Sequence, residues 1–198
     1  NLFYKGFQKL VRFNSIGLNY FIVLTCCFFS LILLGTNKKF AWILSIAFGL
    51  NTWILDSLWA SHVTKIMSLA YMSLVLSGTI AYIQNKKLIG IVAVIFGVVF
   101  SIGYQHFQIV YYGIIMIVFL TIYLAYNAIQ THQMGDYVKR GLILISIALL
   151  SALTNLSTIY AIQDYNKDTM RGGKTELVKS EATSTSKEGG LDINYAFS

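Results

Sequence analysis

The residues best suited to chemistry in this sequence stand where apolar runs meet short polar turns. Cationic side chains at such junctions can hold an anion, and amide or phenol groups can add hydrogen bonds. Arginine grips a phosphate with two parallel hydrogen bonds, whereas lysine supplies a point charge. A phosphate attached to a lipid would be presented at this depth. The polar residues at these junctions include Asp56, His62 and Lys65, then Gln105, His106, Gln108, Tyr111 and Tyr112, and beyond the last apolar run Asp164, Lys167, Asp168 and Arg171.

The segment Arg171-Gly172-Gly173-Lys174 adds glycines whose backbone N–H groups can approach an anion closely. It is not a Walker loop, because its glycine and lysine spacing differs and no strand precedes it. Each candidate also has a purely structural explanation. The tyrosines can be aromatic-belt anchors, Lys65 can snorkel toward water, and Arg171 can be one more loop charge.

The composition is that of an integral membrane protein. Of the 198 residues, 56% are hydrophobic and only 12% are charged. The apolar residues form long uninterrupted runs, which is typical of helices surrounded by lipid or by other apolar helices. The formal net charge is +7, but the lysines lie beside the apolar runs. Their position indicates membrane lipids rather than nucleic acid as the partner.

The apolar runs predict an all-α, polytopic bundle of about six transmembrane helices within residues 16–160. The predicted spans are 16–35, 40–55, 63–83, 88–104, 109–126 and 141–160. Residues 127–140 read as a longer polar loop. Roughly 20 residues are needed to cross a bilayer, and most of these runs reach that length or fall slightly short. The chain contains no proline, which suggests straight helices.

Both flanks of the bundle differ from it in composition. Residues 1–15 space their apolar positions as one helix face does, so they read either as an amphipathic helix in the interface or as an ordinary lead-in to the first span. Residues 161–198 are polar, and the Ser/Thr/Gly-rich stretch within them reads as a mobile loop.

Lysine and arginine predict the orientation. The turns at Lys38/Lys39, Lys86/Lys87 and Lys139/Arg140 fall on one face, so the positive-inside rule places them in the cytoplasm. The candidate site and residues 161–198 are then extracytoplasmic. The basic residues within 1–15 run against this orientation.

Few polar groups lie deep in the spans. Asn51 and Asn155 are interpreted as hydrogen-bonding to neighbouring helices, although a functional role is the alternative. Cys26 and Cys27 are adjacent on a predicted helix, where they cannot easily pair, and read as small apolar side chains. The spacing of cysteine and histidine shows no zinc-ligand pattern.

Several segments occur in the order seen in a known family. They are "SHVTKIMSLAYMSLVLSG", "QHFQIVYY", "TNLSTIY" through "DYNKDTMRGGKTEL", and "GLDINYAFS". In these the chain resembles YfhO-like bacterial membrane proteins, with good specificity from about Gly49 onward. Two departures are Ser73 and Phe107, which stand where the family often has proline.

That family is similar to GT-C glycosyltransferases, which pass a sugar from a polyprenyl-phosphate carrier to an acceptor outside the cytoplasm. The resemblance implies that six of the polar residues surround the carrier-facing cavity in a bacterial cytoplasmic membrane, namely His62, Lys65, Gln108, Tyr111, Tyr112 and Arg171. It also implies that the acidic catalytic residue precedes Asn1, so that the chain is an internal fragment of a longer enzyme, inactive alone. No cofactor is evident, and a divalent metal is compatible with the class. The alternatives are a transporter or flippase segment and a membrane scaffold.

Overall fold

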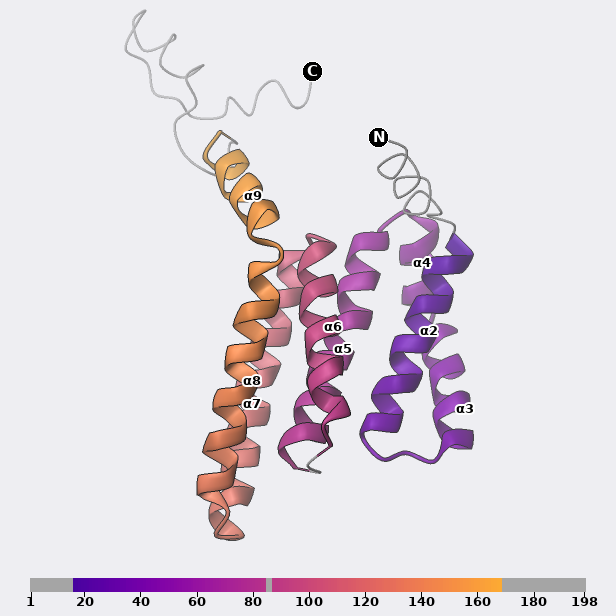
Figure 1. Ribbon diagram of the computed structural model, residues 1–198. Coiled ribbons are helices and arrows are strands. Elements are labelled where there is room, and N and C mark those ends of the chain that lie inside the picture. Colours follow the sequence, from indigo (N-terminus) through magenta and orange to yellow (C-terminus); the bar gives the residue numbers. More distant parts are fainter. Residues whose placement is uncertain (1–15, 85–86, 169–198) are drawn as a thin grey trace, which may run out of the picture. The chain divides into compact units, whose positions relative to one another are not determined.

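The computed structural model of the chain describes residues 16–84 and 87–168. Their regular secondary structure is entirely helical, which confirms the predicted all-α class. The chain divides into two compact units, with the boundary between Leu156 and Ser157. The helices, shown in Figure 1, are α2 (Ile16–Leu33), α3 (Lys38–Gly49), α4 (Thr52–Trp59), α5 (Val63–Ile83), α6 (Ile89–Gly103), α7 (Phe107–Gln130), α8 (Met134–Leu153) and α9 (Leu156–Asp168).

Among the described residues, three helices are long and apolar enough to cross a membrane, namely α2, α5 and α7. A fourth span results if α3 and α4 count as one bent span. Helix α6 is apolar but has 15 residues, and α8 carries Asp136, Lys139 and Arg140 within its first two turns. The membrane character is therefore supported, and the number of six spans stays a prediction.

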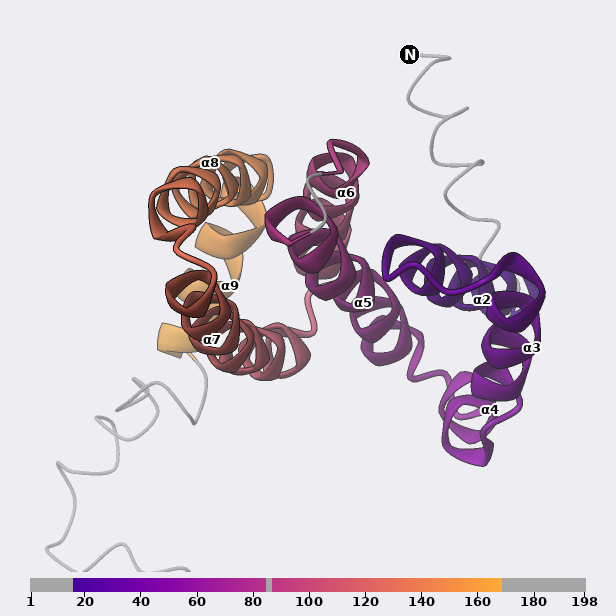
Figure 2. The same cartoon turned by 90° about the horizontal axis from the view of Figure 1, so that it is seen from below.

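Helix α5 is the centre of the first unit. It packs against α2, α4, α6, α7 and α8, and Figure 2, which looks along the helices, shows it between α2 and α7. Its low amphipathicity follows from its sequence, since apolar and small residues occur all round the helix. A helix that is apolar on every side is stable only when it is surrounded by other helices or by lipid.

Glycines let α5 and α6 approach until their backbones touch. A Cβ added to Gly78 would lie 2.7 Å from the carbonyl oxygen of Gly90, and one added to Gly90 would lie 2.5 Å from that of Gly78. Gly97 faces Tyr71 and Val75 in the same way. Such small-residue contacts drive helix association in lipid, where apolar surface alone gives no preference for another helix.

The predicted span 40–55 is wrong in its shape. Helix α3 ends at Gly49, α4 begins at Thr52, and the two axes differ by 54°. Asn51 causes the new start, because its side chain accepts a hydrogen bond from the N–H of Trp53 at 2.9 Å. The expectation of straight helices is therefore wrong here, and Asn51 caps its own helix instead of bonding a neighbour.

Helices also extend through the predicted polar loop at 127–140. Helix α7 continues to Gln130, and α8 begins at Met134. An ion pair between Asp136 and Arg140, 3.1 Å apart and one turn from each other, supports the first turns of α8. The predicted last span, 141–160, is interrupted between Leu153 and Leu156. There the side chain of Asn155 donates to the carbonyl of Val99 at 2.9 Å, as predicted for a bond to a neighbouring helix.

The helices of the first unit run up and down, so their connections gather at opposite ends (Figure 1). One end holds the α2–α3, α5–α6 and α7–α8 connections with Lys38, Lys87 and Arg140, and we call it the basic end. The other holds the starts of α5 and α7, with His62 and His106, and we call it the histidine end. The described basic residues therefore gather at one end of the bundle, although Lys139 and Arg140 lie within α8 and not in the predicted turn.

Candidate functional site

The histidine end is built from the amino termini of two parallel helices. The Met72 side chain of α5 occupies the space where a Cβ of Gly113 in α7 would lie, and Lys65 and His106 each stand seven residues before this contact in their helices. The N-caps of α5 and α7 are both histidines, His62 and His106, and neither makes a side-chain capping bond. The free N–H groups of such termini carry partial positive charge.

Three cationic or ionisable side chains converge at this point. Burial, followed by the positive charges of Lys65 and His62, lowers the pKa of the His106 imidazole from its ordinary value. These influences place His62, Lys65 and His106 within electrostatic reach of one another, and we call them the cationic cluster. The Nε2 atom of His106 is buried and has no hydrogen-bond partner among the described residues. A buried polar atom left unpaired is unfavourable, and an incoming partner would relieve it.

Lys65 is held by an aromatic ring instead of a carboxylate. Its ammonium lies 4.9 Å from the centre of the Trp53 ring, and it forms no ion pair within the described part of the chain. The break between α3 and α4 positions this ring, because Trp53 is in the first turn after the Asn51 cap. The charge of Lys65 is thus oriented but not neutralised, so it is available to an anion.

Gln108 and Tyr112 form a second pair, one turn apart on α7. The amide nitrogen of Gln108 donates to the Tyr112 hydroxyl at 2.9 Å. The Tyr111 ring contacts that of Tyr112, with centres 6.0 Å apart, and is 60% exposed. A role of Tyr111 in the site stays a prediction.

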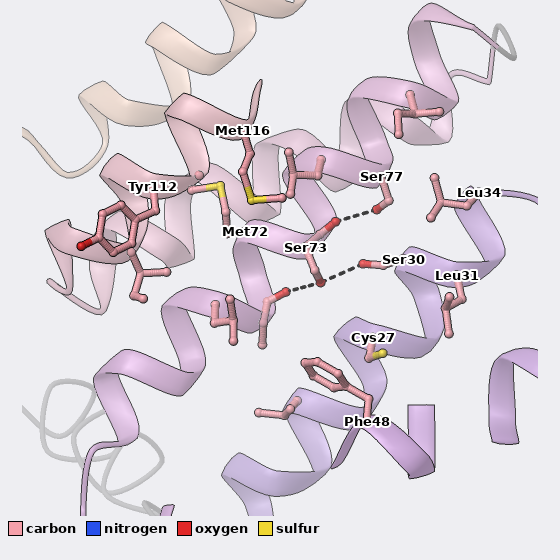
Figure 3. Close-up of a pocket in the computed structure, with 17 residues that line it drawn as sticks. Cys27, Ser30, Leu31, Leu34, Phe48, Met72, Ser73, Ser77, Tyr112 and Met116 are labelled. Carbon is pink, nitrogen blue, oxygen red and sulfur yellow. Dashed lines mark hydrogen bonds between the residues drawn. The ribbon is translucent and has the colours of Figure 1, made fainter. Parts of the chain in front are cut away.

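An apolar groove begins directly beneath these residues. It has a volume of about 440 Å³ and lies between α2, α3, α5 and α7. Two residues that line it, Leu69 and Tyr112, lie one helical turn after Lys65 and Gln108, respectively. In Figure 3, Met72 and Met116 form one wall, and Ser30 of α2 meets Ser73 of α5 at 2.9 Å across the groove. The polar head of a lipid at the histidine end would therefore have an apolar channel below it.

The remaining predictions for this site have separate outcomes. Arg171 and the glycines beside it lie outside the described residues. Across residues 16–84 and 87–168, no three His, Cys, Asp or Glu side chains are grouped as a metal site requires. Cys26 and Cys27 are both free thiols, and Cys26 packs in the core as a small apolar residue.

His106 is absent from the six candidates that the resemblance implies, although it stands among the polar residues of its junction in the sequence. The sequence does contain a signal for it, since His62 and His106 each stand within three residues of the start of a predicted span. What it does not contain is the parallel packing of α5 and α7, which brings the two histidines together.

The chain matches no protein-family model, no curated protein and no solved structure. The arrangement at the histidine end must therefore carry the functional argument by its geometry and chemistry.

Proposed function

We propose that this chain forms the carrier-binding part of a bacterial membrane glycosyltransferase, which moves a sugar from a polyprenyl-phosphate carrier to an acceptor in the cell envelope. The observation that carries the proposal is the cationic cluster of His62, Lys65 and His106 standing directly above an apolar groove. A lipid phosphate needs both features, a positive site at the membrane surface and an apolar channel for its chain.

The chemistry follows from the charges. When a glycosyl group leaves a lipid phosphate, negative charge grows on the phosphate oxygens, and fixed positive groups stabilise that charge in the transition state. Lys65 supplies a positive charge, and the buried Nε2 of His106 can donate a hydrogen bond whenever it carries a proton, in the Nε2–H tautomer of the neutral ring or in the imidazolium. The amino termini of α5 and α7 add partial positive charge from the backbone. Arg171 is proposed as a further phosphate ligand by its residue type.

The proposed orientation puts the basic end in the cytoplasm and the histidine end outside. The lysines and Arg140 at the basic end favour this direction by the positive-inside rule. The phosphate site then opens to the compartment in which cell-envelope acceptors are found.

The test is binding of a short-chain polyprenyl phosphate to the purified protein and to Lys65→Gln. Loss of one charge-assisted contact is expected to weaken binding by about 1.5–3 kcal/mol, roughly tenfold to a hundredfold. The matched control is Lys39→Gln at the basic end, which should bind as the wild type does. Equal affinity in Lys65→Gln and the wild type would remove the proposed phosphate site.

A transporter or flippase is the second candidate, and the broken helix pair α3–α4 is the observation that favours it. Discontinuous helices are common where transporters bind their cargo. Movement of a labelled lipid phosphate between leaflets of a vesicle, without transfer of its sugar, would support this candidate over the first.

A further inference from the structure

The apolar groove beneath the cationic cluster has a definite length. Its lining runs along α5 from Leu69 to Ile80 and along α2 from Val23 to Leu34. Each of these stretches rises by about 16 Å, at about 1.5 Å per residue. Because Leu69 lies one turn after Lys65, a chain that enters beside the cationic cluster reaches the far end of the groove after this distance.

Three serines line this groove, yet each of their hydroxyl protons is used inside the protein. A serine hydroxyl has one proton to donate. Ser73 donates to the carbonyl oxygen of Ala70 at 2.7 Å, so Ser30 must be the donor in the 2.9 Å contact between Ser30 and Ser73 (Figure 3). Ser77 donates to the carbonyl oxygen of Ser73 at 2.8 Å. An apolar chain that covers these serines therefore leaves none of their protons unpaired.

The other walls of the groove favour a hydrocarbon chain over a polar ligand. Leu31 of α2, Phe48 of α3 and Leu76 of α5 contribute apolar side chains. Met72 and Met116 add two unbranched thioether chains, which adapt to irregular shapes such as that of a methyl-branched ligand. With the serine protons already paired, the groove has little to offer a polar cargo.

The size of the groove corresponds to about three isoprenyl units by two separate measures. An extended isoprenyl unit advances by four carbon–carbon bonds of about 1.5 Å, which is about 5 Å along the chain, so the length of the groove holds about three units. A cavity of about 150 Å³ holds one benzene molecule, which is close to an isoprenyl unit in size. The volume of about 440 Å³ therefore also holds about three units. Agreement between length and volume indicates a single chain that lies along the groove.

We propose that the groove binds the first three isoprenyl units of the carrier and that the rest of a longer chain lies outside it, in the bilayer. Leu34, at the far end of the lining, is 45% exposed, so the chain can leave the groove there. The inference rests on the proposed function, which supplies an isoprenoid substrate. It adds a length limit that the residues of α2 and α5 set.

The test is a series of prenyl phosphates with one, two, three, four and eleven isoprenyl units, bound to the purified chain in one detergent. Leu76→Trp fills the groove about 10 Å beyond Leu69. Dividing its dissociation constant by that of the wild type for each ligand cancels the partition of that ligand into the micelle. The ratio should be near one for one unit, at least tenfold for three units, and the same for four and eleven units as for three. Leu149→Trp is the matched control, because Leu149 is exposed on α8 and does not line the groove, and its ratio should be one throughout.

The wild type alone gives a second measurement, which does not require Leu76→Trp to fold. Its affinity, expressed per mole fraction of ligand in the micelle, should rise up to three units and then stay level. A continued rise up to eleven units would overturn the length limit. A ratio of one for Leu76→Trp at every length, or displacement of the three-unit ligand by an equal amount of phosphatidylglycerol, would overturn the assignment of the carrier chain to the groove.

Lys65→Gln separates this inference from the proposed function. It removes a charge at the phosphate and touches no part of the groove lining, so it should weaken every member of the series by the same factor. That result together with a flat Leu76→Trp ratio would reject the groove as the chain site and retain the phosphate site. Unchanged binding in Lys65→Gln would instead reject the phosphate site itself.

Discussion

His106 is both the N-cap residue of α7 and a member of the cationic cluster at the histidine end. It caps α7 without a side-chain bond, its Nε2 atom is buried without a described partner, and two positive groups act on it. Burial of the ring, followed by the positive charges of Lys65 and His62, disfavours its protonation in the absence of an anion. An anion at the same place would reverse the balance, because it would pair with the imidazolium.

The lowered pKa of His106 gives stability a pH dependence with a definite sign. The unfolded chain binds a proton near its ordinary pKa of about 6.5, whereas the folded chain binds it only at lower pH. The stability that neutral His106 contributes is therefore complete above about pH 6.5 and is lost as pH falls toward the lowered pKa. We expect thermal melting of the wild type, followed from about pH 8 to about pH 5, to fall more steeply than that of His106→Gln.

His132→Asn is the control for this measurement. His132 lies in the α7–α8 turn with a positive φ of 54°, a conformation that asparagine tolerates. Its melting profile should follow the wild type across the same range. Identical slopes for the wild type and His106→Gln would show that His106 has no part in the acid sensitivity.

Among the described helices, the contact between α5 and α6 is the most extensive and depends on glycine. Gly78→Ala places a methyl group against the backbone oxygen of Gly90, where no flexible side chain can move aside. Overpacking of this kind is expected to cost about 1–3 kcal/mol. Gly17→Ala in α2 meets nothing within 4 Å and should leave stability unchanged or slightly higher.

Denaturant-induced unfolding in detergent micelles measures both glycine variants. Equal stability of Gly78→Ala and Gly17→Ala would mean that α5 and α6 can separate at little cost, and that the backbone contact does not hold the centre of the unit.

Sequence patterns predicted helices best where polar residues bound a long apolar run on both sides. Helix α5 has the predicted limits, Val63 and Ile83, because His62 and Gln84 flank 21 residues of continuous helix. The break after Gly49 was missed because apolar residues continue across it, although Gly49 and Asn51 are stop and start signals. The polar stretch 127–140 predicts a loop because it interrupts the apolar runs. In the structure α7 and α8 extend into this stretch, since polar residues mark the end of an apolar run and not the end of a helix.

The candidate site was predictable only in part, for a physical reason. Residue type and position before an apolar run pointed to His62 and Lys65. Their proximity to His106 depends on the packing of α5 against α7, which are not consecutive in the chain. Gly113 allows this packing because it leaves space for the Met72 side chain. The same limit applies to Tyr111 and Tyr112, neighbours in sequence, because only Tyr112 lines the groove.

At the scale of the whole molecule, the proposals rest on which end faces the cytoplasm. The basic end concentrates described lysines and Arg140, whereas the histidine end offers a phosphate site that must face the lipid-linked substrate. If the basic end were outside, the cationic cluster would face the cytoplasm, and the proposed transfer to a cell-envelope acceptor could not occur there.

Single cysteines at the two ends decide this orientation. The native Cys26 and Cys27 lie within α2 and are first replaced by alanine. In this background Ala60→Cys marks the histidine end and Lys39→Cys marks the basic end, and both positions are exposed. A membrane-impermeant maleimide added to intact cells should label Ala60→Cys and leave Lys39→Cys unlabelled until the cells are opened, because the positive-inside rule retains the lysine-rich turns in the cytoplasm. Labelling of Lys39→Cys alone in intact cells would reverse the topology and, with it, the assignment of the carrier site to the outer surface.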